Sequence, residues 1–211
     1  MFEKPTLYVI TDEKLLKDNL IDAVKQAIEG GADIIQYRAK HKDTKDMYEE
    51  AIQLKKICDY YRKPLIINDR IDIALAINAD GVHIGQEDMP VEVARRILGF
   101  DKIIGLSTKN LNQVEEANKL PIDYIGFGSI FPTSTKEDAK VAGLEQLKKA
   151  MEISLVPVVA IGGINEENIE DVIDTGCENI AVVSAVFKDK NIKQNSKRLK
   201  ELLNKKKKMG F

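Results

Sequence analysis

The chain has 211 residues, 44% of them hydrophobic, which is enough to build a sizeable core in one globular domain. Its formal net charge is only −2, with 32 basic and 34 acidic side chains mixed along the sequence, so we expect no general affinity for nucleic acid or membranes. No apolar stretch approaches the roughly 20 residues of a membrane span, and residues 1–5 lack the features of a signal peptide, so a cytoplasmic protein is expected.

Eight short apolar runs predict buried strands. In chain order they cover residues 7–10, 34–37, 65–67, 81–84, 103–106, 124–127, 158–161 and 180–183. Continuous rather than alternating apolar residues are typical of parallel strands that are buried on both faces. Segments with helical periodicity separate the runs. The order βα repeated eight times predicts an α/β fold, a single (β/α)₈ TIM barrel.

Several helices follow from their apolar stripes. The stripe from Leu20 to Ile28 predicts a helix that ends at Gly30-Gly31, where a left-handed residue is needed. Only a two-turn helix over residues 71–77 fits between the third and fourth runs. A final helix from about residue 193 to 203 should cover the barrel, and residues 204–211 should form a charged, flexible tail. We therefore expect residues 1–211 to be one domain.

The two cysteines indicate neither a metal site nor a disulfide. Cys58 falls on the apolar face of an expected helix with Leu54, and Cys177 follows the end of another helix. Their positions show no spacing typical of metal ligands. We predict buried, reduced thiols.

In a TIM barrel the loops after the strands form the active site, so the residues that follow the runs should converge on one face. After the second run, Arg38 and Lys40 place two cations two residues apart. A guanidinium and an ammonium together suit phosphate oxygens. The alternative interpretation is two surface cations beside a local carboxylate such as Asp43.

Two aspartates follow the third and fourth runs. Asp69 stands in Asn68-Asp69-Arg70, and Asp88 lies 19 residues beyond it, shortly before Pro90. From sequence position alone, a helix N-cap is the favoured interpretation for each. Adjacent barrel strands nevertheless bring the two loops together, and paired carboxylates beside phosphate-binding cations are typical of a Mg²⁺ site.

The loops that follow the last three apolar runs hold further candidates for phosphate binding. The sixth loop, residues 128–138, is long and holds several hydroxyls and Lys136, although a plain surface loop is an alternative. The glycines Gly162 and Gly163 follow the seventh run, and Ser184 follows the eighth. Loops at these two places often form a phosphate site in this fold.

The number of cations indicates the class of reaction. One phosphate needs only the glycines after the seventh run, which leaves Arg38, Lys40 and Lys136 for a second, more highly charged group. This predicts two phosphorylated substrates, one of them a pyrophosphate, and group-transfer chemistry. No nucleophile is paired with a base, since His41 lies in a lysine-rich loop. For His83, at the end of the fourth run, a packing or orienting role is at least as plausible as proton transfer.

Several motifs closely resemble those of thiamine-phosphate synthases, in the order found in that family. They are YVITD at 8–12, QYRAK at 36–40, NDR at 68–70, GVHIGQEDMP at 81–90, PTSTK at 132–136 and AIGGI at 160–164. The resemblance extends to Ser184 and so spans nearly the whole chain. It implies a TIM-barrel transferase that joins 4-amino-2-methyl-5-pyrimidinylmethyl diphosphate to a thiazole phosphate. The products would be thiamine phosphate and pyrophosphate, with pyrophosphate leaving before the thiazole nitrogen attacks.

The resemblance also implies a role for each matching residue. The pyrimidine diphosphate would be held by Gln36, Arg38, Lys40, Asn68, Ser107 and Lys136. The thiazole phosphate would be held by Thr133, Ser134, Thr135, Gly163, Val183 and Ser184. Asp69 and Asp88 would ligate Mg²⁺. Arg38, Lys40 and Lys136 would stabilise the charge on the leaving pyrophosphate, so they are the catalytic candidates.

One position departs from the family's pattern. Synthases commonly carry a histidine two residues after the serine of the fifth strand, but Lys109 stands there in this chain. A related branch, the thiazole tautomerases, relies on that histidine for proton transfer, so Lys109 argues against tautomerase activity. That branch usually lacks the NDR and PTxTK motifs, which are intact here. A third hypothesis is a non-catalytic binding or regulatory protein that kept the barrel.

Overall fold

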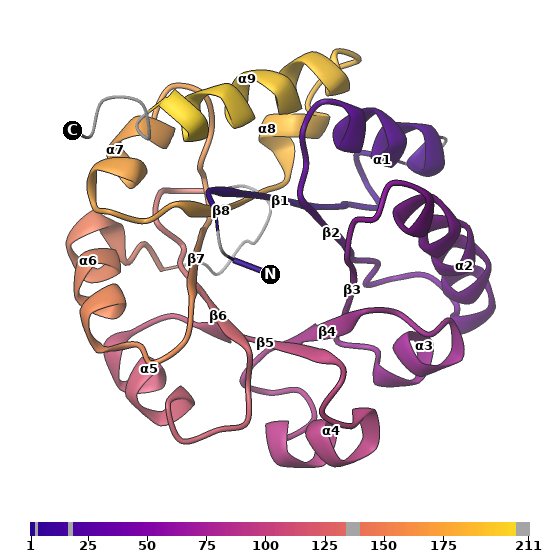
Figure 1. Cartoon of the computed structure of the whole chain (residues 1–211), viewed down its shortest axis with the longest axis horizontal. Coiled ribbons are helices and arrows are strands. Elements are labelled where there is room, and N and C mark those ends of the chain that lie inside the picture. The colour runs from indigo at the N-terminus through magenta and orange to yellow at the C-terminus, as the bar shows by residue number, and fades with distance from the viewer. Residues whose placement is uncertain (3, 17–18, 134–139, 206–211) are drawn as a thin grey trace.

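The computed structural model describes residues 1–2, 4–16, 19–133 and 140–205, which form a closed barrel of parallel strands inside a ring of helices (Figure 1). The strands are β1 (Thr6–Ile10), β2 (Ile34–Tyr37), β3 (Leu65–Asn68), β4 (Gly81–Ile84), β5 (Ile103–Thr108), β6 (Tyr124–Phe127), β7 (Val158–Ile161) and β8 (Asn179–Val182). Each strand pairs with the next along the chain, and β8 pairs with β1. The predicted (β/α)₈ barrel is confirmed.

Helices follow the strands in alternation. They are α1 (Leu20–Glu29), α2 (Thr44–Tyr60), α3 (Ile71–Ala76), α4 (Val91–Leu98), α5 (Leu111–Ala117), α6 (Gly143–Ile153), α7 (Ile169–Asp174), α8 (Ser184–Phe187) and α9 (Ile192–Lys205). The expected short helix over 71–77 is α3. The final helix continues to Lys205, so residues 204 and 205, which we expected in the tail, are helical. Residues 206–211 lie outside the described residues.

Two apolar cores share the strands. Residues that point outward, such as Val9 and Ile35, pack against the helices in the larger core. Residues that point inward, such as Tyr8, Ile66 and Tyr124, fill the barrel itself. Successive strand residues point to opposite faces, so both faces of every strand must be apolar or paired. This explains the continuous apolar runs in the sequence.

Aspartates before three strands tie neighbouring strands together at the amino-terminal end of the barrel. Each carboxylate accepts a hydrogen bond, 2.7–2.9 Å long, from a backbone N–H at the start of the preceding strand. The pairs are Asp33 with Leu7, Asp80 with Leu65, and Asp123 with Ile104. These bonds satisfy backbone donors that the barrel would otherwise leave unpaired.

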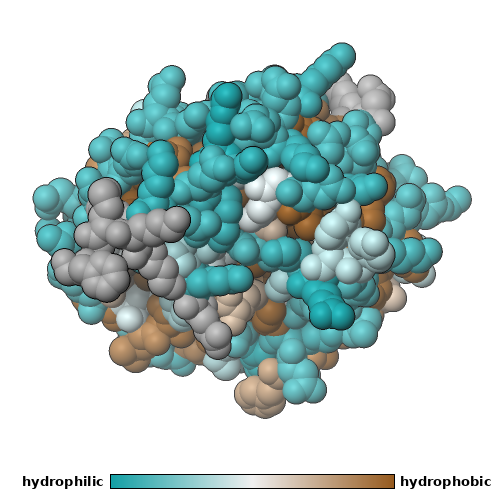
Figure 2. All heavy atoms as spheres, turned by 45° about the horizontal axis from the view of Figure 1, so that its top comes forward, coloured by the Kyte–Doolittle hydropathy of each residue, from teal (hydrophilic) through white to brown (hydrophobic). Residues whose placement is uncertain are grey.

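The final helix secures the junction between β1 and the helical ring. Lys200 on α9 donates to the Asp33 carboxylate and to the carbonyl oxygen of Pro5, both at 2.6 Å. Lys193 pairs with Glu29 of α1 at 3.0 Å. The side of the molecule around α9, brought forward in Figure 2, is mostly hydrophilic. No helix in the described part of the chain is long and apolar enough to cross a membrane.

Candidate active site

A cavity of about 280 Å³ lies at the carboxyl ends of the strands. Every predicted site residue within the described chain lines it. These residues are Gln36, Arg38, Lys40, Asn68, Asp69, Asp88, Ser107, Thr133, Gly163, Val183 and Ser184. The remaining predicted residues, Ser134, Thr135 and Lys136, lie outside the described residues. The barrel thus brings residues from the exits of β2 through β8 into one cavity.

The two cations after β2 are held over the cavity by separate partners. The backbone N–H of Arg38 donates to the Thr11 hydroxyl at 3.0 Å, and the Arg38 guanidinium lies 3.8 Å from the Asp12 carboxylate. Lys40 forms an ion pair with Asp69. Asp43, the carboxylate of the alternative interpretation, instead occupies the N-cap position of α2. In the described chain the carboxylates that face these cations are therefore Asp12 and Asp69 rather than Asp43.

Asp69 and Asp88 lie beside each other at the cavity wall. The Asp69 backbone has a positive φ of 59°, and its N–H donates to the carbonyl oxygen of His83 at 2.9 Å. The Asp88 carboxylate accepts from the Gly85 N–H at 2.6 Å. Neither aspartate caps a helix, because the N-cap residues of α3 and α4 are Arg70 and Pro90. The cap interpretation is wrong for both.

The environment of Asp69 suits a cation. Burial raises the pKa of its carboxyl above the ordinary value; Lys40 opposes this rise, and the neighbouring Asp88 adds to it. Two adjacent carboxylates repel each other unless positive charge lies between them. Lys40 supplies such charge here, and a divalent cation would supply more. The donor set of two carboxylates beside the cations Arg38 and Lys40 fits Mg²⁺ with a phosphate ligand.

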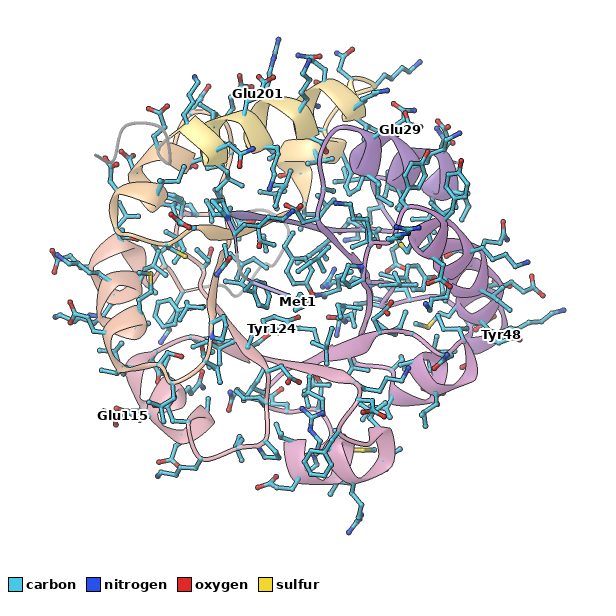
Figure 3. The ribbon with its side chains drawn as sticks, viewed as in Figure 1. Met1, Glu29, Tyr48, Glu115, Tyr124 and Glu201 are labelled. Atoms are coloured by element: carbon cyan, nitrogen blue, oxygen red, sulfur yellow. The ribbon has the colours of Figure 1, made fainter. Side chains whose placement is uncertain are left out.

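Hydrogen-bonded side chains form the floor of the cavity. Gln36 donates its Nε2 to the hydroxyl of Tyr8 at 2.8 Å, and the Tyr8 and Tyr124 hydroxyl oxygens lie 2.7 Å apart. His83 continues the series, with Nδ1 2.9 Å from the Tyr124 hydroxyl and Nε2 2.8 Å from the Ser107 hydroxyl. Figure 3 shows Tyr124 inside the ring of strands. The orienting role considered for His83 agrees with this geometry.

Local sequence explains why Tyr124 can lie across the barrel. A Cβ atom at Gly105 would come within 2.1 Å of the Tyr124 ring, so only glycine leaves room for it. Burial raises the pKa of both Tyr8 and Tyr124. Both phenols are therefore neutral and able to donate one hydrogen bond each.

The opposite wall is built from glycine backbone and a helix start. Gly162 and Gly163 have φ values of 102° and 65°, a region that disfavours other residues. A Cβ atom at Gly163 would meet the Pro132 carbonyl oxygen at 2.4 Å. Helix α8 begins at Ser184, where the first N–H groups of a helix lack intrahelical acceptors. This wall offers backbone donors rather than charged side chains.

The cavity includes residues that sequence reasoning missed. Tyr8 and Tyr124 line it, and so do Lys109 and Lys140. The alternation of side chains along a strand was a usable signal for Tyr8. Tyr8 stands two residues before Ile10 on β1, so both side chains point into the barrel. Lys140 had no comparable signal, since it follows a long loop.

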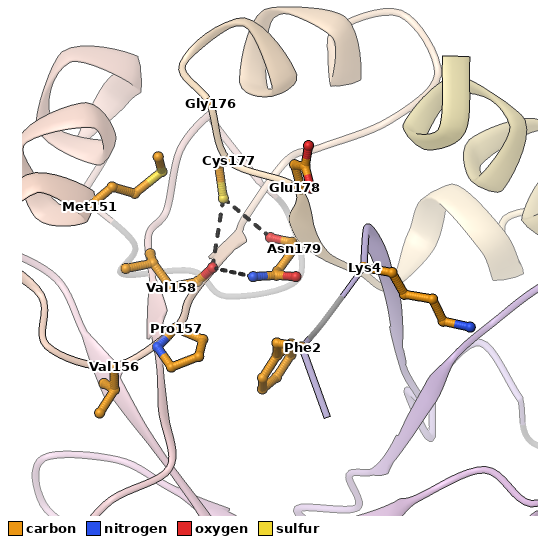
Figure 4. A pocket seen from close by; sticks show the side chains of 10 residues that line it. All are labelled: Phe2, Lys4, Met151, Val156, Pro157, Val158, Gly176, Cys177, Glu178 and Asn179. Carbon is orange, nitrogen blue, oxygen red and sulfur yellow. Dashed lines mark hydrogen bonds between the residues drawn. The ribbon is translucent and has the colours of Figure 1, made fainter. Parts of the chain in front are cut away.

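A second hollow, of about 310 Å³, lies at the amino-terminal end of the barrel around Cys177 (Figure 4). The Cys177 thiol lies 3.4 Å from the Asn179 carbonyl oxygen and 3.7 Å from that of Val158. Burial raises the pKa of this thiol, so it stays protonated and unreactive. Among the described residues that line it, only Lys4 and Glu178 are charged, so it lacks the paired carboxylates and clustered cations of the first cavity. The predicted buried, reduced state of Cys58 and Cys177 is confirmed.

Comparison with known proteins identifies close relatives. A family model described as thiamine monophosphate synthase matches residues 7–186. The thiamine-phosphate synthase of Persephonella marina is 66% identical, over 94% of this chain and 95% of that protein. Thiamine-phosphate synthase 1 of Aquifex aeolicus is 46% identical, over 92% and 91%. The solved thiamine phosphate pyrophosphorylase of Pyrococcus furiosus is 44% identical, with a TM-score of 0.88 over 95% of this chain and 96% of that one.

Proposed function

This chain belongs to the thiamine monophosphate synthase family, and we propose that its cavity joins 4-amino-2-methyl-5-pyrimidinylmethyl diphosphate to a thiazole phosphate. The bond from the methylene carbon to the diphosphate oxygen breaks, and a bond from that carbon to the thiazole nitrogen forms. Thiamine phosphate and pyrophosphate are the products. The observation that carries this proposal is the convergence of the described motif residues on one cavity.

The side of the cavity that carries Arg38 and Lys40, here called the cationic wall, is the binding surface for the diphosphate. Arg38 and Lys40 project from the β2 exit, where their partners are carboxylates rather than buried backbone groups. Because these ion pairs are partly exposed, a diphosphate can exchange with them at low cost. Asn68 at the end of β3 and Ser107 near the end of β5 add amide and hydroxyl groups to the same cavity. The family motif extends this surface to Lys136.

The cofactor of this proposal is Mg²⁺, held by Asp69 and Asp88. When bound, it neutralises charge on the leaving diphosphate. The two carboxylates lie side by side, and burial raises the pKa of Asp69. That arrangement favours a site that binds a cation. Asp69 also accepts from Lys40, which links the metal site to the diphosphate surface.

The wall formed by Gly162, Gly163 and the start of α8, here called the glycine wall, is the binding surface for the thiazole phosphate. Gly163 lines this wall, and Ser184, the first residue of α8, lines the same cavity, where the first backbone N–H groups of a helix suit a phosphate. Val183 and Thr133 also line this part. In this proposal Ser134 and Thr135 complete the site through the family motif.

A dissociative reaction fits the side chains at the cavity. The tyrosines are neutral, and burial keeps both cysteines protonated, so the described chain offers no activated nucleophile there. The electron-rich aminopyrimidine stabilises the cation that forms when the diphosphate departs. The protein then needs to stabilise the leaving charge and align the two rings. Arg38, Lys40 and Lys136 meet the first need in this proposal.

Tautomerase activity is not favoured. That activity uses a histidine at the position of Lys109, and Lys109 lines the cavity instead. The two histidines of the chain lie elsewhere: His41 is exposed beside Glu13, and His83 is bonded into the cavity floor. A purely regulatory role would not require the paired carboxylates and the cationic wall together.

The decisive test is pyrophosphate release by the purified protein with both substrates and Mg²⁺. We expect release only when both substrates and the metal are present, together with stoichiometric thiamine phosphate. Omission of each component in turn is the control. Turnover of a thiazole isomer without any pyrophosphate release would instead support the tautomerase. Binding of both substrates without product would support a regulatory protein.

A further inference from the structure

The loop after β2 carries Lys40 but has little backbone support of its own. Outside the helices and strands, no backbone–backbone hydrogen bond in the described part of the chain involves residues 39–42. A segment whose backbone groups bond neither to each other nor to a strand is free to move unless other groups hold it. The position of Lys40 therefore depends on contacts from outside this loop.

Glu13, which follows β1, supplies such contacts. Its carboxylate accepts hydrogen bonds from the backbone N–H of Lys40 at 3.2 Å and from that of His41 at 3.1 Å. Successive backbone N–H groups that point at one anion are a recurrent way for a loop to bind a negative charge. Bonds to a carboxylate are stronger than bonds between neutral groups, and the Glu13 side chain is only 15% exposed. Glu13 thus holds the backbone at Lys40.

The two residues before Glu13 hold the start of the same loop. Thr11 accepts from the backbone N–H of Arg38, and the Asp12 carboxylate lies 3.8 Å from the Arg38 guanidinium. The Asp12 carboxylate also accepts from two backbone N–H groups of its own turn, at 2.9 and 3.2 Å. Three consecutive residues after β1 therefore contact the loop after β2. Glu13 is the one of the three that reaches Lys40.

The support from Glu13 leaves the side chain of Lys40 free to act in the cavity. The Lys40 ammonium pairs with Asp69, and both residues line the cavity. A loop that is already ordered does not lose further conformational freedom when a ligand binds. A cation that is displaced by an ångström also stabilises a leaving group less well. The backbone bonds from Glu13 can therefore affect both binding and turnover.

We infer that Glu13 is a positioning residue, which holds Lys40 where the cationic wall meets the diphosphate. The inference rests on the proposed function for the identity of the ligand. The charge of Glu13 has the opposite effect, because a carboxylate close to the cationic wall repels a diphosphate. Loss of charge alone would strengthen the binding of a diphosphate, whereas loss of positioning would weaken it. The two effects of removing Glu13 thus differ in sign.

The first test measures the binding of pyrophosphate by calorimetry in the presence of Mg²⁺. Glu13→Ala should weaken binding by about tenfold, because two backbone N–H groups lose a charged acceptor. Glu13→Gln keeps an acceptor oxygen without the charge, so its affinity should lie between those of the wild type and Glu13→Ala. Unchanged or tighter binding by Glu13→Ala would overturn the inference, and so would a Glu13→Gln variant that binds no better than Glu13→Ala.

Glu49→Ala is the control for loss of one negative charge. Glu49 is exposed on α2, where it pairs with the exposed Lys45 at 4.0 Å. Its removal should leave the affinity for pyrophosphate within about a factor of two, since exposed charges are screened. A loss equal to that of Glu13→Ala would overturn the inference.

Steady-state kinetics separate positioning from general damage. Glu13→Ala should raise KM for the pyrimidine diphosphate by about tenfold and lower kcat, while KM for the thiazole phosphate stays within about a factor of two. Equal increases in both KM values would overturn the inference. A wild-type protein that releases no pyrophosphate from the two substrates would refute the proposed function alone, because calorimetry with pyrophosphate requires no turnover.

The last test needs no ligand. Exchange of backbone amide protons with solvent, followed by NMR, reports whether Glu13 holds the loop. In Glu13→Ala the amides of Lys40 and His41 should exchange at least about tenfold faster than in the wild type. The internal reference is the amide of Leu65, which donates to the Asp80 carboxylate at the other end of the barrel. Faster exchange at Lys40 and His41 alone supports the inference, and the same acceleration at all three amides would overturn it.

Discussion

The hydroxyl oxygens of Tyr8 and Tyr124 lie 2.7 Å apart inside the barrel, although 116 residues separate them in the sequence. They come from β1 and β6, which are not neighbours in the sheet. The bond therefore crosses the interior rather than following a strand pair. It joins the two sides of the cavity floor and leaves each hydroxyl dependent on the other.

Tyr124→Phe should lower the free energy of unfolding by about 1–3 kcal/mol, because Tyr8 and His83 each lose a buried hydrogen-bond partner. Urea unfolding followed by circular dichroism measures this. The control is Tyr48→Phe, at a tyrosine that is exposed on α2, which should change stability by less than about 0.5 kcal/mol. If Tyr124→Phe and Tyr48→Phe had the same free energy of unfolding, the hydrogen bonds of the cavity floor would not contribute to stability.

Asp69→Asn and Asp88→Asn should each fold normally and require at least about tenfold more Mg²⁺ for half-maximal turnover, because one carboxylate of the pair is neutralised. Each asparagine keeps an oxygen acceptor, so the bond from Gly85 to residue 88 can persist. Magnesium titrations measure the effect. Asp72→Asn is the control, since this aspartate pairs with Arg70 outside the cavity. Unchanged metal dependence in both site variants would rule out this metal site.

Gly163→Ala should weaken binding of the thiazole phosphate far more than binding of the pyrimidine diphosphate. The new Cβ atom would meet the Pro132 carbonyl oxygen and force that wall to move. Gly143→Ala is a matched control, because Gly143 also has a positive φ but nothing lies within 4 Å of its added Cβ. Both variants should share a backbone cost of about 1–2 kcal/mol. Calorimetry with each ligand alone separates the effects; equal losses for both ligands would indicate general damage.

Lys136→Ala should lower kcat by about 10²-fold while altering KM far less, if this lysine meets the diphosphate as charge leaves the methylene carbon. Lys136→Arg should recover only part of the loss, because a guanidinium lacks the compact geometry of an ammonium. Steady-state pyrophosphate release at saturating substrate measures both. Lys205→Ala is the control and should leave turnover within about a factor of two, since Lys205 is exposed at the end of α9 and exposed charges are screened. A Lys136→Ala variant that matched this control would refute the leaving-group role.

The native protein should resist thiol modification at pH 8. Burial raises the pKa of Cys58 to about 12 and raises that of Cys177 as well, so burial both suppresses the thiolate at pH 8 and shields the two thiols. Ellman's reagent should find no rapidly reacting thiol in the folded protein and two after denaturation with guanidinium. One equivalent of fast reaction in the folded protein would show that a thiol is exposed.

Much of the site follows from the order of strands and loops along the sequence. Strand exits in a parallel barrel converge by topology, so Arg38, Asp69 and Gly163 could be assigned to one face from their positions after apolar runs. The choice between a helix cap and a metal ligand for Asp69 could not be made in the same way. That choice depends on where α3 begins, and helix boundaries shift by a residue or two with local packing.

The alternation of apolar runs with helical periodicity was enough to predict the barrel, because a chain of parallel strands that is apolar on both faces has few other ways to bury them. It also determined which loops meet. The bonds across the interior, such as those that join Tyr8, Tyr124 and His83, became visible only in the folded barrel. Such bonds depend on side-chain direction and on the space left by Gly105, to within less than an ångström. No local pattern encodes a distance between residues that meet only when the sheet closes.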